Sequence, residues 1–599
     1  MMRSTQAVLA LSLVAPSAVA AQVTSRASVN SAGVQANEDS FNASISADDR
    51  CVAFASRSDN LAAGDTNTSF DIFVRDLLSG TTELISVDSA GAQANGFSYW
   101  TSISADGRFV AFVSEATNLV AVDTNGVRDV FVRDRQSGTT ERVNVDSAGT
   151  QGNGSCHYPS LSADGRYVAF SGYAGNLVPG DTNGAADVFV RDRQSGTTER
   201  VSVTSAGIQA NGSSGEYALW MSADGRYVAF NSDASNLVAG DTNGARDVFV
   251  HDRQSGTTER VSVDSAGAEG NGFSGSNGVS ITADGRYVVF DSSASNLVSG
   301  DTNVARDIFV RDRQTGTTER ASVDSAGTQG NYHSGWPSIS ADGRYVTFDS
   351  YASNLVLGDT NSARDVFVRD RQSGTTELAS VSSTGTQGNA DSYPALFSAD
   401  HRYVVFGSYA TNLVAGDTNY RLDVFIRDRA YSPLTSLCDP GAAGVLACPC
   451  SNPPGGSGRG CDNSAATGGA MLSASGVAYL SMDTLVFTTS DEKPTATSIV
   501  LQGDGLLVNG TAFGQGVRCA GGSLNRMYQK TAVNGSITAP EFATGDPSVS
   551  ARAAQLGVPL LPGVVHYYLV YYRDPAVLGG CSSLATFNCT QTGSVTYWP

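Results

Sequence analysis

Residues Ser162 to Phe170 read "SADGRYVAF", and this stretch returns along the chain with only small changes. Repeats of fixed period indicate an architecture built from one supersecondary unit. Each copy predicts four strands, which in the third copy are "YPSLSA", "RYVAFSG", "ADVFVRD" and "TTERVSV", joined by Gly-bearing turns that suit antiparallel pairing. The turn aspartate occurs seven times, spaced by 58 or 60 residues, at Asp48, Asp106, Asp164, Asp224, Asp284, Asp342 and Asp400.

The second and third strands of each copy are apolar on both faces. In the third copy Tyr167 and Ala169 lie on one face, and Val168 and Phe170 on the other. A sheet covered on one side alternates apolar with polar residues, so these sheets must be covered on both sides. Four-stranded sheets packed face to face around an axis satisfy this, and we predict an all-β fold with a seven-bladed β-propeller.

The two ends of the repeat region predict how the ring closes. The seventh copy has three strands and then breaks off into "RAYSPLTSLC". Residues 24–37, "TSRASVNSAGVQAN", match "TERVSVTSAGIQAN" at residues 198–211 nearly letter for letter. We therefore expect the N-terminal segment to supply the outer strand of blade seven.

The repeat resembles a known type. "SADGRYVAF" followed by "DVFVRD" is similar to the PD40, or WD40-like, repeat of TolB-type propellers, with Ala where that motif has Pro. The resemblance covers about 400 residues and implies a propeller fold. It leaves function open, because such propellers range from scaffolds to accessory domains of peptidases.

The sequence predicts one targeting segment and two folded parts. Arg3, an apolar run of about ten residues and a small-residue site near Ala20 predict a Sec signal peptide at residues 1–20. No later stretch approaches the ~20 apolar residues needed to span a bilayer, so we expect a secreted protein, extracellular or periplasmic. We assign 21–431 to the propeller, 432–462 to a Cys/Gly/Pro-rich linker and the start of a C-terminal module, and 463–599 to the small β-sandwich of that module.

Seven of nine cysteines fall in the C-terminal part, which in an oxidising compartment predicts disulfides. Cys448 and Cys450 are too close to pair readily with each other, and the odd number leaves one thiol free or bonded elsewhere. A four-cysteine zinc site is the alternative, although "CPC" departs from C-x2-C spacing. The run "GGAMLSASGVAYLSMDTLVFTTS" resembles C-terminal modules of secreted planctomycete-type proteins. The disulfide candidates are Cys438, Cys448, Cys450, Cys461, Cys519, Cys581 and Cys589.

The corner "GDTNGARDVFVHD", which begins at Gly240, offers oxygen ligands from Asp241, Asn243 and Asp247. An EF-hand is excluded, because position five is Ala245 and the twelfth residue lies beyond a strand. Two interpretations remain: an Asx-turn closed by its own hydrogen bonds, or a structural calcium ion in each blade. No other cofactor is indicated. The candidate residues are Asp65, Asn67, Asp71, Asp123, Asn125, Asp129, Asp181, Asn183, Asp187, Asp241, Asn243, Asp247, Asp301, Asn303, Asp307, Asp359, Asn361, Asp365, Asp417, Asn419 and Asp423.

The third-to-fourth-strand hairpin "HDRQSGTTER" places Asp252, Arg253, Glu259 and Arg260 across from one another, which predicts solvated ion pairs of small worth within one hairpin. Symmetry-breaking acids, such as Glu115, Glu216 and Glu269, have no evident partner in the sequence.

Aromatic residues that differ between blades precede the innermost strands. Antiparallel blades place all long loops on one face, so these residues should ring the channel mouth. Aromatic faces among amide side chains suit a glycan or a peptide, although they could instead fill the gap between blades. The predicted rim residues are Tyr99, Trp100, His157, Tyr158, Tyr217, Trp220, His333, Trp336 and Tyr393.

Charge and motifs narrow the function. The net charge is -20, and Lys493 and Lys530 are the only lysines, so no basic face exists for nucleic acid. The sequence contains no H-E-x-x-H or G-x-S-x-G motif. We expect a non-enzymatic binding or surface-structural protein with a glycan or protein ligand at the rim. The alternatives are a polysaccharide hydrolase or lyase at the channel mouth, and a self-assembling matrix protein.

Overall fold

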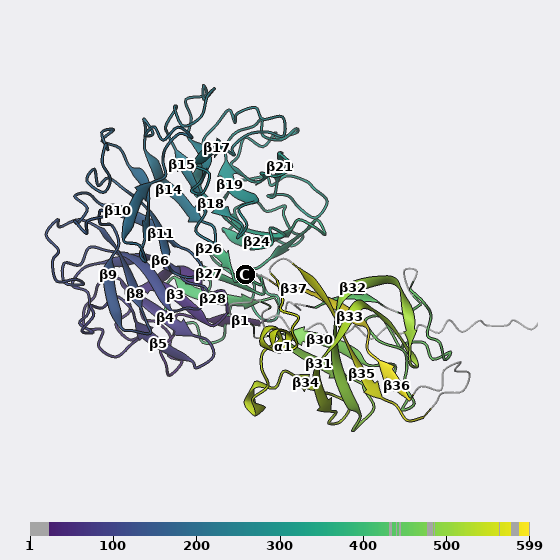
Figure 1. Ribbon diagram of the computed structural model, residues 1–599. Coiled ribbons are helices and arrows are strands. Elements are labelled where there is room, and N and C mark those ends of the chain that lie inside the picture. The colour runs from purple at the N-terminus through teal and green to yellow at the C-terminus, as the bar shows by residue number, and fades with distance from the viewer. Residues whose placement is uncertain are drawn as a thin grey trace, which may run out of the picture.

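The computed structural model describes residues 23–429, 434–438, 440–441, 445–475, 478, 483, 485–561, 564–576 and 586–597. The predicted signal peptide and Cys581 lie outside the described residues. Within them, seven four-stranded antiparallel sheets follow one another around a ring (Figure 1). The predicted seven-bladed propeller is confirmed.

Each blade runs from an innermost to an outermost strand. Blade one is β2 (Ser40–Ile45), β3 (Cys51–Ser56), β4 (Asp71–Asp76) and β5 (Thr81–Leu84); blade two is β6 (Ser98–Ile103), β7 (Phe109–Ser114), β8 (Asp129–Asp134) and β9 (Thr139–Arg142). Blade three is β10 (Cys156–Leu161), β11 (Tyr167–Gly172), β12 (Asp187–Asp192) and β13 (Thr197–Arg200); blade four is β14 (Ser214–Met221), β15 (Tyr227–Ser232), β16 (Asp247–Asp252) and β17 (Thr257–Arg260). Blade five is β18 (Ser274–Ile281), β19 (Tyr287–Ser292), β20 (Asp307–Asp312) and β21 (Thr317–Arg320); blade six is β22 (Ser334–Ile339), β23 (Tyr345–Ser350), β24 (Asp365–Asp370) and β25 (Thr375–Leu378).

Blade seven contains both ends of the repeat region. Its sheet is β26 (Ser392–Phe397), β27 (Tyr403–Ser408), β28 (Asp423–Asp428) and β1 (Val23–Arg26). Val23 lies opposite Asp428 in the antiparallel pairing of β1 with β28. Ser28 Oγ then donates to Asp423 Oδ1 at 2.6 Å. The predicted closure of the ring by the N-terminal strand is confirmed.

The propeller core lies between blades, as the two-sided apolar pattern requires. All six residues of β3 are buried. One cluster joins Ala53 and Ile72 of blade one to Phe112 and Phe131 of blade two, and the same arrangement recurs around the ring. Burial of apolar area on both faces of every sheet therefore holds neighbouring blades together.

The structure explains why alanine, and not proline, stands in the "SADG" turn of blades two and three. Ala105 N donates to Ala163 O at 2.9 Å, and Ala163 N donates to Ala223 O at 2.8 Å. Proline has no N–H, so the residue that the PD40 motif places here could not make these bonds between blades.

Six of the blade interfaces carry the same arginine–glutamate pair, which corrects the expectation of ion pairs within one hairpin. Arg253 pairs with Glu199 of the preceding blade and Glu259 with Arg313 of the following one, while Asp252 pairs with Arg226. The tight turns of adjacent blades are close neighbours in a ring, so these side chains reach across the interface. The six pairs are Arg135–Glu83, Arg193–Glu141, Arg253–Glu199, Arg313–Glu259, Arg371–Glu319 and Arg429–Glu377.

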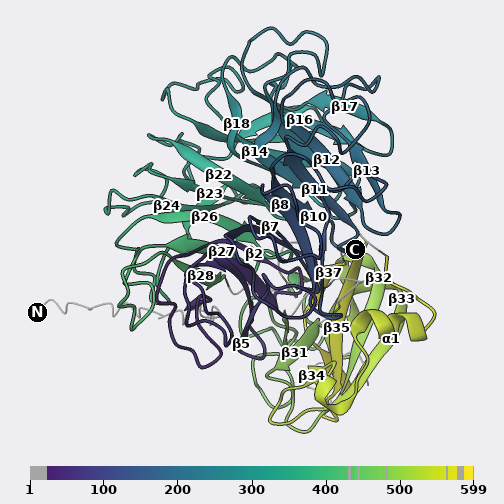
Figure 2. The same ribbon diagram turned by 90° about the vertical axis from the view of Figure 1, so that its left-hand side faces the viewer.

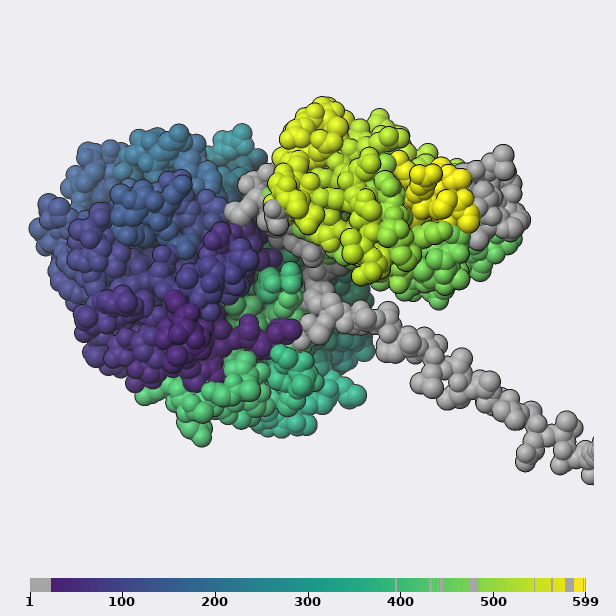
Figure 3. Space-filling model, turned by 90° about the horizontal axis from the view of Figure 1, so that it is seen from below, coloured from purple at the N-terminus to yellow at the C-terminus, as the bar shows by residue number. Residues whose placement is uncertain are grey.

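The C-terminal module has two sheets and forms a second body beside the propeller (Figures 2 and 3). Residues of both sheets, including Phe487 and Tyr568, share one buried core. A helix α1 (Val549–Gln555) and a 3-10 turn η1 (Phe542–Thr544) complete the described part. The larger sheet is β29 (Thr435–Cys438), β37 (Thr592–Thr596), β35 (Val565–Arg573), β32 (Thr497–Phe513) and β33 (Gly516–Thr531), with β36 (Phe587–Cys589) on β35; the smaller is β30 (Met471–Ser475), β31 (Val486–Ser490) and β34 (Thr538–Ala539).

The expected disulfides are present in this module. Cys438 is bonded to Cys519 and Cys448 to Cys461, and Cys450 is disulfide-bonded as well. The thiol of Cys589 is free and buried. The disulfides exclude a zinc site built on Cys448 and Cys461. No described helix has the length and apolar character to cross a bilayer.

Candidate functional site

Every innermost strand of the propeller shifts register on its way along the channel. Such bulges turn a side chain to a new direction. In blades one, two, three and six the residue there is Asn42, Trp100, Tyr158 or Trp336, with φ of 51°, 51°, 53° and 49°. Asn tolerates this left-handed conformation, whereas for a bulky residue it is strained by about 1–3 kcal/mol.

These bulges surround one cavity of about 470 Å³ at the long-loop end of the channel. This volume is typical of small-molecule sites. Three of the chain's four tryptophans line it. The lining includes one residue or more from each blade, among them Asn42, Trp100, Tyr158, Tyr217, Trp220, Asn277, Trp336, Arg364 and Tyr393.

Six of the nine predicted rim residues line this cavity: Trp100, Tyr158, Tyr217, Trp220, Trp336 and Tyr393. The remaining three lie behind it. Tyr99 and His157 pack on Trp100, with ring centroids 4.8 and 5.6 Å away, and burial lowers the pKa of His157 to about 4. His333 Nδ1 accepts from the backbone N–H of Arg306 at 2.9 Å. These three residues therefore position the lining and its neighbours.

The sequence reading missed a second set of aromatic side chains on this face. The signal of three of them was the residue that follows the second strand of a blade, where three blades have Tyr and the others have Arg, Glu, Asp or Ser, and the other three lie just before an innermost strand. Tyr332 packs edge-on against Tyr351, and Tyr393 against Tyr409. The missed residues, all at least 39% exposed, are Phe97, Tyr173, Phe273, Tyr332, Tyr351 and Tyr409.

The acids without evident partners have partners in the structure. Glu115 pairs with Arg128 at 2.9 Å. Glu216 accepts from the Tyr173 hydroxyl, and Glu269 pairs with Arg260 at 2.8 Å.

Two buried carboxylates lie behind the mouth on blades five and six. Burial raises the pKa of both Asp291 and Asp349 to about 6. Asp291 accepts the backbone N–H of Asn277 at 3.0 Å and lies 3.4 Å from the Arg306 guanidinium. Asp349 lies 3.3 Å from Arg364, which lines the cavity. Both acids are thus paired with arginine.

Space is tight at Gly335, where these groups meet. A Cβ added to Gly335 would lie 3.1 Å from the terminal amide of Asn277 and 3.3 Å from Asp349 Oδ1. The Asn277 amide, oriented by its surroundings, accepts from the Arg306 guanidinium at 2.6 Å. Blades five and six therefore form a joined polar wall beside the aromatic one.

A second, smaller cavity adjoins the mouth cavity along the channel. Trp220, Thr101, Pro159 and Leu396 line both the mouth cavity and this second cavity of about 210 Å³. These four residues lie where the two cavities meet, which we call the floor of the mouth cavity.

The rim loops are tied together by asparagines. Asn95 N donates to Asn118 Oδ1 at 3.0 Å, and Asn118 Nδ2 returns to Gln93 O at 2.8 Å. The same pair of bonds recurs in blades three to seven, for example at Asn153 and Asn176. The loops that carry the exposed aromatics are therefore held by hydrogen bonds.

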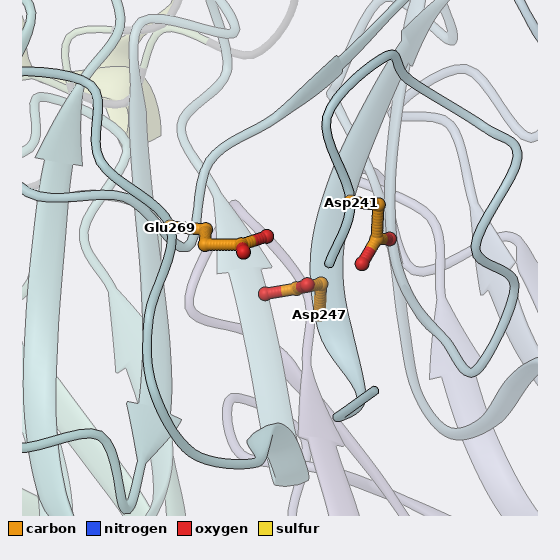
Figure 4. A group of neighbouring side chains, drawn as sticks. All are labelled: Asp241, Asp247 and Glu269. Carbon is orange, nitrogen blue, oxygen red and sulfur yellow. The ribbon is translucent and has the colours of Figure 1, made fainter. Parts of the chain in front are cut away.

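The repeated corners combine a turn with an arginine. Asn243 Oδ1 accepts from Ala245 N at 2.7 Å, as an Asx-turn requires, and the equivalent asparagine does so in all seven blades. Asp241, Asp247 and Glu269 bring carboxylate oxygens within 4.8 Å of one another (Figure 4). Arg260 lies 3.3 Å from Asp247 and 2.8 Å from Glu269, so its guanidinium already balances this acidic group.

The same arrangement recurs in four other blades, with N–O distances of 3.1–3.7 Å. In blades one and six Leu84 and Leu378 replace the arginine. In blade one Gln93 Nε2 donates to both Asp65 and Asp71, at 2.6 and 2.8 Å, and in blade six Gln387 Nε2 donates to both Asp359 and Asp365, at 2.8 Å. The other arginines are Arg26 at Asp417 and Asp423, Arg142 at Asp123 and Asp129, Arg200 at Asp181 and Asp187, and Arg320 at Asp301 and Asp307.

No family model and no curated protein matches the sequence. Among solved structures, an oligogalacturonate lyase in complex with manganese has 14% identity and a TM-score of 0.41, with 65% of this chain and 89% of that chain covered. The oligogalacturonate lyase of Vibrio parahaemolyticus has 14% identity and a TM-score of 0.39, with 66% and 90% covered. TolB from Acinetobacter baumannii has 15% identity and a TM-score of 0.31, with 66% and 81% covered. Likeness at this level says nothing of activity or ligand.

The repeats and the sheets themselves define the class of protein. Seven four-stranded sheets, each carrying the "SADG" turn and the Asp-Val/Ile-Phe-Val/Ile strand, make this chain a seven-bladed β-propeller. Its repeats resemble those of the TolB-like, PD40 type, and a disulfide-bonded β module follows them.

Proposed function

We propose that this propeller is a ligand-binding protein whose site is the aromatic-lined cavity at the channel mouth, with a glycan or a peptide as ligand. The observation that carries this is the strained backbone of Trp100, Tyr158 and Trp336. Asn42 adopts the same conformation in blade one, so the fold itself does not call for an aromatic there. Strain of this kind is retained mainly where it serves a site.

The position of the C-terminal module supports this assignment. The chain leaves blade seven after Asp428, at the end of β28 opposite the long loops. The module therefore departs from the face away from the mouth. We propose that it is a separate β module at 463–599 that begins within the linker 432–462, which supplies β29 and Cys438, with the propeller at 21–431.

We propose a binding role rather than catalysis. Asp291 and Asp349 are buried and engaged with arginines, so neither is poised in the cavity as a general acid or base. The alternative remains a polysaccharide hydrolase or lyase. Release of reducing ends or of unsaturated products from any polysaccharide, lost in the R364A variant, would establish that alternative.

We further propose that the protein is secreted, since the disulfides fit an oxidising compartment. The buried Cys589 thiol argues against intermolecular bonding in a matrix. A mature N-terminus at residue 1 in mass spectrometry of the native protein would contradict secretion by a cleaved signal.

The binding role is tested with matched variants on glycan and peptide arrays. W336A removes a 39%-exposed ring that lines the cavity, and F273A removes a 55%-exposed ring outside it. We expect W336A to lose at least tenfold in affinity and F273A to bind as wild type. Equal loss in both variants would place the site elsewhere on this face.

A further inference from the structure

We infer that the mouth cavity receives the end of an uncharged glycan chain, entering along the channel axis. This inference rests on the proposed binding function and adds to it the charge of the ligand and the direction of its entry. Three observations lead to it: the balanced charges of the mouth, its mixture of aromatic and amide groups, and its wall, to which all seven blades contribute.

The charges at the mouth are balanced within the protein. Arg364 is the charged residue of the described lining, and Asp349 holds it at 3.3 Å. Behind it, Arg306 is shared between Asp291 and the Asn277 amide. An acidic ligand would have to compete with these carboxylates and enter against a net charge of -20. The mouth therefore favours a ligand without charge.

The lining combines groups that suit a sugar ring. Trp100 and Tyr158 lie with ring centroids 4.4 Å apart on blades two and three, and Trp336 comes from blade six. Flat aromatic faces accept the apolar face of a pyranose. Asn42, Asn277 and Thr101 add amides and a hydroxyl that can exchange hydrogen bonds with sugar hydroxyls.

The shape of the cavity sets the direction of entry. All seven blades contribute to its wall, so a chain cannot cross it sideways. Trp220 and its three companions lie beneath, where the second cavity begins. A polymer must therefore enter this cavity end first, whereas an open groove would hold an interior segment.

The experiment uses the full mature chain and isothermal titration, with tryptophan fluorescence as a second readout. The neutral probes are cellotetraose, xylotetraose, mannotetraose and chitotetraose, and the acidic probe is tetragalacturonate. We expect a neutral tetraose to bind, W336A to weaken it at least tenfold and F273A to leave it unchanged. With a 20-unit chain of the same sugar we expect one protein per chain, because only one end of each type exists.

Other results would contradict the uncharged ligand, its entry by an end, or the proposed function itself. Binding of tetragalacturonate alone, with loss in W336A, would overturn the uncharged ligand and keep the proposed function. More than one protein per 20-unit chain would overturn entry by the end. If none of these sugars and no array peptide binds, the proposed function itself fails.

Discussion

Asp49 of blade one and Asp400 of blade seven form a carboxyl pair across the interface that closes the ring. Asp49 Oδ1 and Asp400 Oδ2 are both buried and lack a hydrogen-bond donor among the described residues. The six other interfaces have an arginine and a glutamate; here Leu77 and Ser25 occupy those positions. The closing interface therefore lacks the arginine–glutamate pair and has two neighbouring carboxyl groups in its tight turns instead.

The first prediction is that this interface is more stable in mild acid. Burial, and then the neighbouring carboxylate, raise the pKa of Asp49 well above 3.8, and burial raises that of Asp400. A folded-state pKa above the unfolded one means that the fold binds more protons. Stability is then full below about pH 4 and falls as pH rises through the raised pKa. Arg402, which is paired with Asp428, offsets part of the repulsion between the two carboxyl groups.

The variant D49N isolates this pair, since Asn also tolerates the φ of 62° at this position. We expect its free energy of unfolding at pH 7 to rise by about 1–3 kcal/mol. At pH 5 the gain should be smaller. Asp291 and Asp349 also have raised pKa values, so the quantity to compare is the difference between wild type and D49N, measured by denaturant unfolding at each pH. If the difference in unfolding free energy between wild type and D49N did not change with pH, the raised pKa values of Asp49 and Asp400 would be contradicted.

The second prediction concerns the six interfaces that have the arginine–glutamate pair. Arg253 contacts Glu199, the carbonyl of Gly225 and the face of Tyr167, with its guanidinium carbon 4.3 Å from the ring centroid. R253A should lower the free energy of unfolding by about 1–3 kcal/mol. E199A, at an exposed partner, should lower it by less than about 1 kcal/mol. If thermal unfolding showed equal losses of stability in R253A and E199A, the ion pair alone would account for the contribution of Arg253.

Much of the fold could be predicted from the sequence because the same strands are written seven times. The missing fourth strand of blade seven and its copy at residues 24–37 even predicted how the ring closes. The partners of charged residues could not be predicted in the same way. Arg253 and Glu199 are 54 residues apart, and six of the seven repeats have the arginine and six the glutamate, so sequence alone does not say which copies meet.

The candidate site was predicted in part for a similar reason. Trp100, Tyr158 and Trp336 were visible because they break the repeat. Their left-handed φ was not, since it follows from a register shift that depends on both neighbouring strands. The arginine that pairs with the corner acids was also missed. Arg260 lies in β17, whereas Asp241 precedes β16, and the sequence predicted that Arg260 pairs within the hairpin of these two strands.

The third prediction concerns metal at the corners. Because Arg260 balances Asp241, Asp247 and Glu269, we expect EDTA to leave the melting temperature of the wild type unchanged. R260L leaves three carboxylates within 4.8 Å of one another and should melt several degrees lower, with calcium restoring part of the loss. R142L is the matched control, since its blade has Gln151 in place of the glutamate. A fall in the melting temperature of the wild type with EDTA would instead support the calcium interpretation.

The fourth prediction concerns the alanine of the turn. Ala105→Pro removes the N–H that reaches Ala163 O, leaves that carbonyl without this donor, and should cost about 1–3 kcal/mol of unfolding free energy. Ala341→Pro is the control, because no such bond from its N–H is found in the described part of blade six, and the PD40 motif has proline there. Denaturant unfolding of both variants decides the matter. If A341P is as unstable as A105P, the cost arises from the turn conformation and the bond between blades is not its cause.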